Sequence, residues 1–251
     1  LYFYLSYLVQ KNQFKGLKDI ISNIEYINST LLLSQGKSWI ESKNFKNFQN
    51  VFSCQNHNHI ISEFLFLISN LYSSQDDFER SNFYLYLSNF SNPKFIFNLS
   101  LVAENYYFNQ DYKKSKKILN NFKEKDNFYY WFRVKKEAQI IAKQKSDEDS
   151  IKFISSQFKK IDSPNNKMIF DIANFYKNSK DYETAIKYYS IVIENLGNNS
   201  DIKSDLLYRR GGSYERIGDY NNADKDLLES LSIYPDDAYV LNYLAYSWLE
   251  R

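Results

Sequence analysis

Residues 206–237 read LLYRRGGSYERIGDYNNADKDLLESLSIYPDD, and this stretch carries most of the information that decides the fold. The small residue Gly211 stands three positions before Tyr214, and a Gly-Asp turn begins at Gly218. The second half is amphipathic and ends at Pro235, which cannot continue a helix. The stretch therefore predicts a helix, a tight turn, a second helix and a stop.

The same order recurs along most of the chain. Residues 168–193, MIFDIANFYKNSKDYETAIKYYSIVI, place Ala173 three positions before Tyr176 and a turn at Lys180. Successive copies are offset by roughly 34 residues, and the apolar stripe of each helix is too wide for one partner to cover, so the units are expected to stack. The clearest units span 62–95, 96–130, 166–203 and 204–237, and poorer copies run from Ser29 to Phe52 and from Trp131 to Ile154.

This period, with its recurring small and aromatic positions, resembles the tetratricopeptide repeat. The resemblance extends over nearly all of residues 1–251. It implies an all-α fold, a right-handed α-solenoid of about seven helix pairs that forms a single array and is cut at both ends. Two alternatives remain: an irregular all-helical domain, and a pentatricopeptide RNA binder, whose basic groove suits a nearly neutral chain badly.

Composition and charge exclude several classes of protein. The chain has 251 residues, of which 43% are hydrophobic and 25% charged, as expected of a globular protein. A net charge of +2 gives no basic field for nucleic acid, and the single cysteine excludes an intrachain disulfide. The apolar opening LYFYLSYLVQ is far shorter than the roughly 20 residues that span a bilayer, so no transmembrane segment is expected.

The scarce reactive residues do not predict an enzyme. Cys54, His57 and His59 lie close together between repeats, but no fourth ligand is near them, so we expect a solvated loop and no metal. The chain has no other histidine, no glycine-rich phosphate loop and no hydrolase motif. Clustered carboxylates fall at turns and helix starts, where they cap free amides. We therefore expect neither catalysis nor a cofactor.

The resemblance implies that the first helix of each unit lines a concave face that binds extended peptides or helices of other proteins. Aromatic rings and carboxamides on that face suit a peptide backbone, although a composition rich in Phe, Tyr and Asn would also place them there by chance. The residues expected on this face are Phe66, Asn70, Phe97, Tyr107, Phe132, Lys135, Gln139, Phe170, Asn174, Lys177, Tyr208, Tyr239, Asn242 and Tyr246.

One function within the family can be tested residue by residue. The members that bind chaperone tails hold a terminal carboxylate with basic and amide side chains over three successive units. Lys135 suits the first place, but Gln139 replaces the expected Asn, and Asp171 and Asp205 stand where basic or amide partners are needed. Two acidic residues would repel a carboxylate, so this function is disfavoured.

The expected function is that of a non-catalytic scaffold or adaptor for another protein. The alternative is a regulatory or substrate-docking segment of a larger enzyme whose catalytic domain lies outside residues 1–251. The junction PDDAYVLNYLAYSW at 235–248 also resembles a group of bacterial tetratricopeptide proteins, many of them exported or lipid-anchored. That resemblance implies the periplasmic side of a bacterial envelope rather than the cytoplasm. Nothing in the sequence demands an oligomer.

Overall fold

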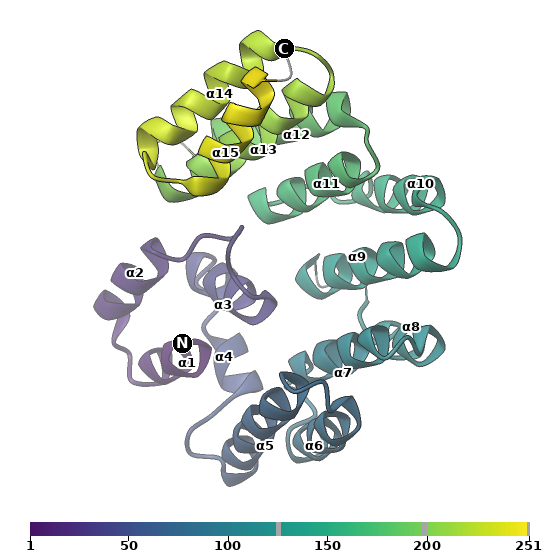
Figure 1. The fold of residues 1–251 in the computed structure, drawn as a ribbon. Helices are drawn as coiled ribbons and strands as arrows, with labels where there is room; N and C mark the ends of the chain where they lie inside the picture. Colours follow the sequence, from purple (N-terminus) through teal and green to yellow (C-terminus); the bar gives the residue numbers. More distant parts are fainter. Residues whose placement is uncertain (124–126, 197–199, 250–251) are drawn as a thin grey trace. The chain divides into compact units, whose positions relative to one another are not determined.

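The computed structural model describes residues 1–123, 127–196 and 200–249, and every regular element in these ranges is an α-helix (Figure 1). The expected all-α class is therefore confirmed. Contacts divide the chain into two compact units, Leu1–Gln144 and Lys145–Arg251. That the two units continue one another as a single array stays a prediction.

The first unit contains nine of the described helices. Within it α5 packs on α6, α6 on α7, and α7 on α8, so that neighbouring helix pairs lie against one another. The bounds are α1 Tyr2–Gln10, α2 Phe14–Ser22, α3 Leu31–Glu41, α4 Lys46–Val51, α5 His57–Ser73, α6 Phe78–Ser91, α7 Phe97–Phe108, α8 Tyr112–Leu119 and α9 Asn127–Gln144.

The second unit repeats the same packing. Here α11 packs on α12, α12 on α13, α13 on α14, and α15 contacts both α13 and α14. The bounds are α10 Asp147–Phe158, α11 Asn166–Asn178, α12 Tyr182–Leu196, α13 Ser200–Arg216, α14 Tyr220–Ile233 and α15 Ala238–Leu249. Among the helices of the described ranges, none combines the length and the apolar character that crossing a bilayer takes.

The turn between paired helices has a recurring chemistry. A residue with positive φ is followed by an aspartate that caps the next helix: Asp77 Oδ1 accepts from the Arg80 amide at 3.1 Å, and Asp111 Oδ1 from the Lys114 amide at 3.0 Å. Asp219 does the same after Gly218, whose φ is +80°. Each cap satisfies an amide that the helix start leaves unpaired, which explains why Asp recurs at this place.

Small residues bring paired helices close together. A side chain at Gly211 would place its Cβ 3.1 Å from Leu227 Cγ and 3.3 Å from the Ala223 carbonyl oxygen, so glycine is needed where α13 crosses α14. At the crossing of α5 and α6 the small residues are serines, and the Ser62 and Ser88 hydroxyls lie 2.8 Å apart. Such hydroxyls satisfy each other and nearby carbonyls while keeping the backbones close.

A buried ion pair ties three helices of the second unit. Arg210 Nε and Nη2 donate to the Asp226 carboxylate at 2.7 and 2.8 Å, and Arg210 Nη1 donates to Ser190 Oγ at 3.0 Å. Asp226 is buried, so its charge depends on this bidentate partner. The pair links α13 to α14 and, through the serine, to α12.

The N-terminal helices pack inside the first unit instead of preceding α5 in the stack. One apolar core joins Tyr2 and Phe48 to Phe66, Phe95 and Val102, and therefore connects α1 and α4 with α5 and α7. Helix α3 contacts α9, and Leu31 packs beside the core under α7–α9. The helix pair predicted between Ser29 and Phe52 thus forms as α3 and α4, but it packs against helices far along the chain (Figure 1).

Candidate functional site

Two adjoining cavities on the second unit form a continuous groove. Their volumes are about 220 and 340 Å³, and Tyr208, Arg216 and Tyr243 line both. Most of the lining comes from α13 and α15, with smaller contributions from α11 and α12. We call this surface the tyrosine groove; it is lined by Lys177, Tyr182, Tyr208, Arg209, Gly212, Ser213, Glu215, Arg216, Tyr239, Asn242, Tyr243, Tyr246 and Ser247.

Tyr243 lines both cavities and lies between α13 and α15 side chains. Its ring meets Tyr208 edge to face at a centroid distance of 5.8 Å, and its hydroxyl donates to Glu215 Oε2 at 2.9 Å. Burial, followed by the hydrogen bond to Glu215, raises the pKa of the Tyr243 phenol, so it stays a neutral donor. The phenol lies close to Gly212, where an added Cβ would be 3.4 Å from the Tyr243 oxygen, at ordinary contact distance.

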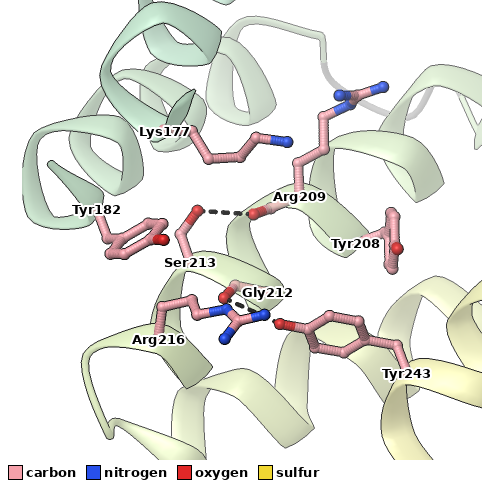
Figure 2. Close-up of a pocket in the computed structure, with 8 residues that line it drawn as sticks. All are labelled: Lys177, Tyr182, Tyr208, Arg209, Gly212, Ser213, Arg216 and Tyr243. Carbon is pink, nitrogen blue, oxygen red and sulfur yellow. Dashed lines mark hydrogen bonds between the residues drawn. The ribbon is translucent and has the colours of Figure 1, made fainter. Parts of the chain in front are cut away.

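Three cations reach the first cavity (Figure 2). Arg209 is paired with Asp205 one helical turn earlier, at 2.9 Å, and its guanidinium lies over the Phe170 ring at 5.3 Å. Arg216 has a largely exposed side chain, and its Nε lies 3.6 Å from a Glu215 carboxylate oxygen.

The third cation is Lys177, which comes from α11. In the part of the chain that the structure describes, no carboxylate lies within ion-pair distance of its ammonium group. Its side chain is half-buried. Burial, and then the charge of Arg209, lower the pKa of Lys177, while the charge of Asp205 raises it. Because Asp205 is itself paired with Arg209, a half-buried ammonium without an ion pair of its own is the electrostatic feature that distinguishes this groove.

The sequence-predicted residues of the second unit divide into two groups. Five of them line the groove, and Tyr239 and Tyr246 among them are 80% and 60% exposed. Phe170 and Asn174 lie behind it: Phe170 supports Arg209, and Asn174 Oδ1 accepts from the Tyr189 hydroxyl at 2.7 Å. The five lining residues are Lys177, Tyr208, Tyr239, Asn242 and Tyr246.

Sequence reasoning missed Arg209, Arg216 and Tyr243, which are central to the groove. Arg216 stands eight positions after Tyr208 and Tyr243 four after Tyr239, so helical spacing places them on the predicted face. The face of an amphipathic helix is about 100° wide, and a single position per turn underestimates it.

In the first unit the predicted face is engaged in internal packing. Phe66 is only 8% exposed, and its ring packs on Phe95 and Phe97 at centroid distances of 5.4 and 5.6 Å. Asn70 is exposed, but its amide donates to the Phe66 carbonyl oxygen. The N-terminal helices contribute to the same core, so Phe66 is a core residue in this fold.

The remaining predicted residues of the first unit lie on α7 and α9. The Tyr107 ring lies under the Lys136 ammonium at 4.5 Å, and Phe132 packs edge to face on Phe122. Gln139 Oε1 is buried and has no hydrogen-bond partner among the described residues, and Lys135 is half-buried. Within the second unit, the structure therefore brings five of the predicted residues to one groove, and within the first unit the predicted residues take part in internal packing.

The cysteine and histidine cluster takes part in local structure. The Ser53 amide donates to His59 Nδ1 at 3.0 Å, and burial, followed by Lys94, lowers the pKa of that histidine. Cys54 is exposed. Within the described ranges, no group of three or more His, Cys, Asp or Glu side chains is arranged to hold a metal ion.

The comparisons with known proteins agree with the helical-repeat fold. A family model described as tetratricopeptide repeat matches residues 167–194 and 204–237, which correspond to α11/α12 and α13/α14. These two helix pairs therefore match the tetratricopeptide repeat. Repeats of this family generally mediate protein–protein interaction. No curated protein sequence matches the chain.

Two solved structures match the chain. YrrB, described as a TPR protein with an unusual peptide-binding site, is 14% identical with a TM-score of 0.46, and the match covers 72% of this chain and 90% of YrrB. The APC/C hetero-tetramer Cut9–Hcn1 is 11% identical with a TM-score of 0.54, and the match covers 99% of this chain and 56% of that chain. At these identities the second likeness concerns the fold alone.

Proposed function

We propose that the tyrosine groove binds an extended, acidic segment of another protein, and that this recognition involves no chemistry on the segment. The observation that carries the proposal is Lys177, a half-buried ammonium at the groove that has no paired counter-ion among the described residues, since the nearby Asp205 carboxylate pairs with Arg209. A carboxylate of the ligand would supply that counter-ion in a partly desolvated place, where an ion pair is worth more than on an open surface.

The rest of the lining suits a polypeptide. Tyr208, Tyr239 and Tyr246 offer rings for apolar contact and hydroxyls for hydrogen bonds at a low cost in side-chain entropy. The Asn242 amide can both donate to and accept from a peptide backbone. Because the two cavities adjoin, an extended segment can pass from Lys177 on α11 to α15 and use both.

Of the two acidic residues that would repel a carboxylate, Asp171 and Asp205, the first lines neither cavity. The repulsion expected from Asp205 is offset because this carboxylate pairs with Arg209. Glu215 likewise accepts from the Tyr243 hydroxyl and lies near Arg216. The cations at the groove therefore outnumber its carboxylates by the charge of Lys177.

A protein ligand fits the chain better than nucleic acid, because a net charge of +2 offers no extended basic surface for phosphates. We propose no cofactor and no catalytic role for residues 1–251. The periplasmic location that the junction at 235–248 implies stays a prediction.

The test is a binding measurement with two pools of synthetic peptides of equal length. One pool carries Asp and Glu at fixed positions, and the matched pool carries Asn and Gln there. Fluorescence anisotropy is measured with the unaltered chain, with Lys177→Met, and with Lys187→Met. Lys187 is exposed on α12 and lines neither cavity, so Lys187→Met is the matched control.

We expect the acidic pool to bind more tightly, and Lys177→Met to remove that preference by about tenfold or more, while Lys187→Met keeps it. Equal binding of the two pools would contradict the proposal. So would an acidic preference that Lys177→Met leaves intact, because the carboxylates would then bind elsewhere.

A further inference from the structure

Helices α5 and α6 expose a continuous set of large apolar side chains. The exposed fractions run from 38% for Leu87 to 85% for Phe90. We call this set the apolar end face; it consists of Ile60, Ile61, Phe64, Leu67 and Leu71 on α5 and Phe83, Leu87 and Phe90 on α6, whereas the exposed Tyr86 lies against Tyr106 of α7 and is not part of it. Scattered single apolar residues on a surface are ordinary, but a contiguous set of this size marks an interaction surface.

The spacing of these residues is that of a packing face. Ile60, Phe64, Leu67 and Leu71 follow one another at i, i+4, i+7 and i+11, which forms one stripe along α5. The stripe lies opposite Ser62, Phe66 and Ser69, which are buried. Helix α5 therefore has two packing faces, of which one is buried inside the unit and the other is exposed.

The exposed face lies where a stacked array would place the preceding helix pair. In the chain that pair is α3/α4, and it packs with α1 and against α9. Its placement leaves the apolar end face uncovered within the first unit, as the exposed fractions show. The face is thus built like an interface between repeats but has no repeat on it.

Charge favours a copy of the same face as the occupant. None of the eight side chains is charged, and the acidic and basic residues of α5 and α6 are Glu63, Glu79 and Arg80. An isologous interface brings each surface against itself, so like charges would repel across the axis. A face without charges meets its own copy without that cost.

The area is also sufficient. A fully covered aromatic side chain buries roughly 150–250 Å², and three of the eight residues are aromatic, with exposed fractions of 59–85%. Together with the five aliphatic residues, the face approaches the roughly 800 Å² per partner that a stable interface buries. It exceeds the roughly 300–600 Å² of the largest patch on an ordinary monomer.

We propose that the apolar end face pairs with the same face of a second copy of the chain about a two-fold axis. The two α5/α6 pairs then form a four-helix layer, with ridges of one pair in the grooves of the other. This surface belongs to the first unit and shares no residue with the tyrosine groove, so the dimer and the proposed peptide binding can be tested separately.

The experiment is sedimentation velocity of the full 251-residue chain over a wide range of concentrations, with Leu67→Glu and Leu228→Glu compared with the unaltered chain. Leu67 is 55% exposed in the middle of the face, and Leu228 is 49% exposed on α14 and serves as the matched control. Circular dichroism confirms that both variants keep their helices, since each substitution is at an exposed position.

We expect a monomer–dimer equilibrium whose dissociation constant rises by about 100-fold in Leu67→Glu and is unchanged in Leu228→Glu. A chain that is monomeric at all concentrations would overturn the proposal, because the face would then be covered within one chain or by another partner. A dimer that Leu67→Glu does not weaken would place the interface elsewhere. Species that grow beyond the dimer would exclude a closed two-fold pairing.

Discussion

At the scale of single residues, Lys177 decides the character of the groove. Its ammonium is half-buried beside Arg209, and burial and that neighbouring charge together lower the pKa of Lys177. The protonated form is therefore less favoured than in an exposed lysine, whose pKa is about 10.4. A bound carboxylate would reverse this, because it stabilises the ammonium and raises the pKa of Lys177 in the complex.

The pH dependence of binding follows from that linkage. Since the pKa of Lys177 is higher in the complex than in the free chain, affinity for the acidic peptide pool is complete below the free pKa. It is lost as pH rises through the pKa of the complex. We expect this loss to disappear in Lys177→Arg, which stays charged throughout the range. Anisotropy titrations at successive pH values measure it, and identical profiles for the two chains would contradict the assignment.

Other residues show why a sequence predicts only part of a site. Part of the groove was predictable. Helical spacing puts Tyr239 and Asn242 on one face of α15, and the predicted Tyr208 of α13 lines the same cavity. The loss of Phe66 to the core was not predictable, since it depends on α1 and α4 packing on α5 and α7. No local pattern reports a contact between helices that lie so far apart in the sequence.

At the scale of elements, the recurring turns explain why the repeat pattern was readable. Gln110, Lys180 and Gly218 all have positive φ, and each precedes an aspartate cap. Pro93 and Pro235 stand just past the ends of α6 and α14, as the sequence predicts. The turns and the helix ends depend on residues that are adjacent in the sequence. Their pattern therefore remains recognisable in a chain whose repeats differ in detail.

The crossing of α13 and α14 gives a prediction about stability. Gly211→Leu should lower the free energy of unfolding by about 1–3 kcal/mol. Leu227, the Ala223 carbonyl and Asp226 already surround the site, and Arg210 holds Asp226 in place. Chemical denaturation followed by circular dichroism measures the change.

The matched control is Gly16→Ala on α2, where an added Cβ would meet nothing within 4 Å. This substitution should raise stability by up to about 1 kcal/mol, because alanine loses less backbone entropy than glycine in a helix. If Gly211→Leu is neutral, the close crossing does not set the identity of that residue.

At the scale of the whole molecule, the two units use their helices differently. In the second unit α13 and α15 provide most of the lining of the tyrosine groove, whereas in the first unit α5 and α7 share a core with the N-terminal helices α1 and α4. Repeat number alone therefore overestimates the surface available to a partner, and the first unit contributes its apolar end face instead.

Separate cores predict separate losses of stability. Phe66→Ala should cost about 3–5 kcal/mol, the usual range for a buried phenylalanine. Hydrogen exchange should then accelerate in α1, α4, α5 and α7, whose residues share the core with Phe66, while α13 and α14 keep their protection. Mass spectrometry of exchanged peptides measures both regions. Equal acceleration in the two units would show that they unfold together.

The contact of α3 with α9 also bears on how the chain is made. Leu31 leaves the ribosome almost a hundred residues before Tyr129, whose core it joins. At a synthesis rate of about 5–20 residues per second, the apolar surfaces of α1–α4 wait for several seconds before their partner helices emerge. During that interval the nascent chain exposes the apolar residues of α1–α4, so early chaperone capture would matter more for this chain than for an array whose repeats dock in the order of synthesis.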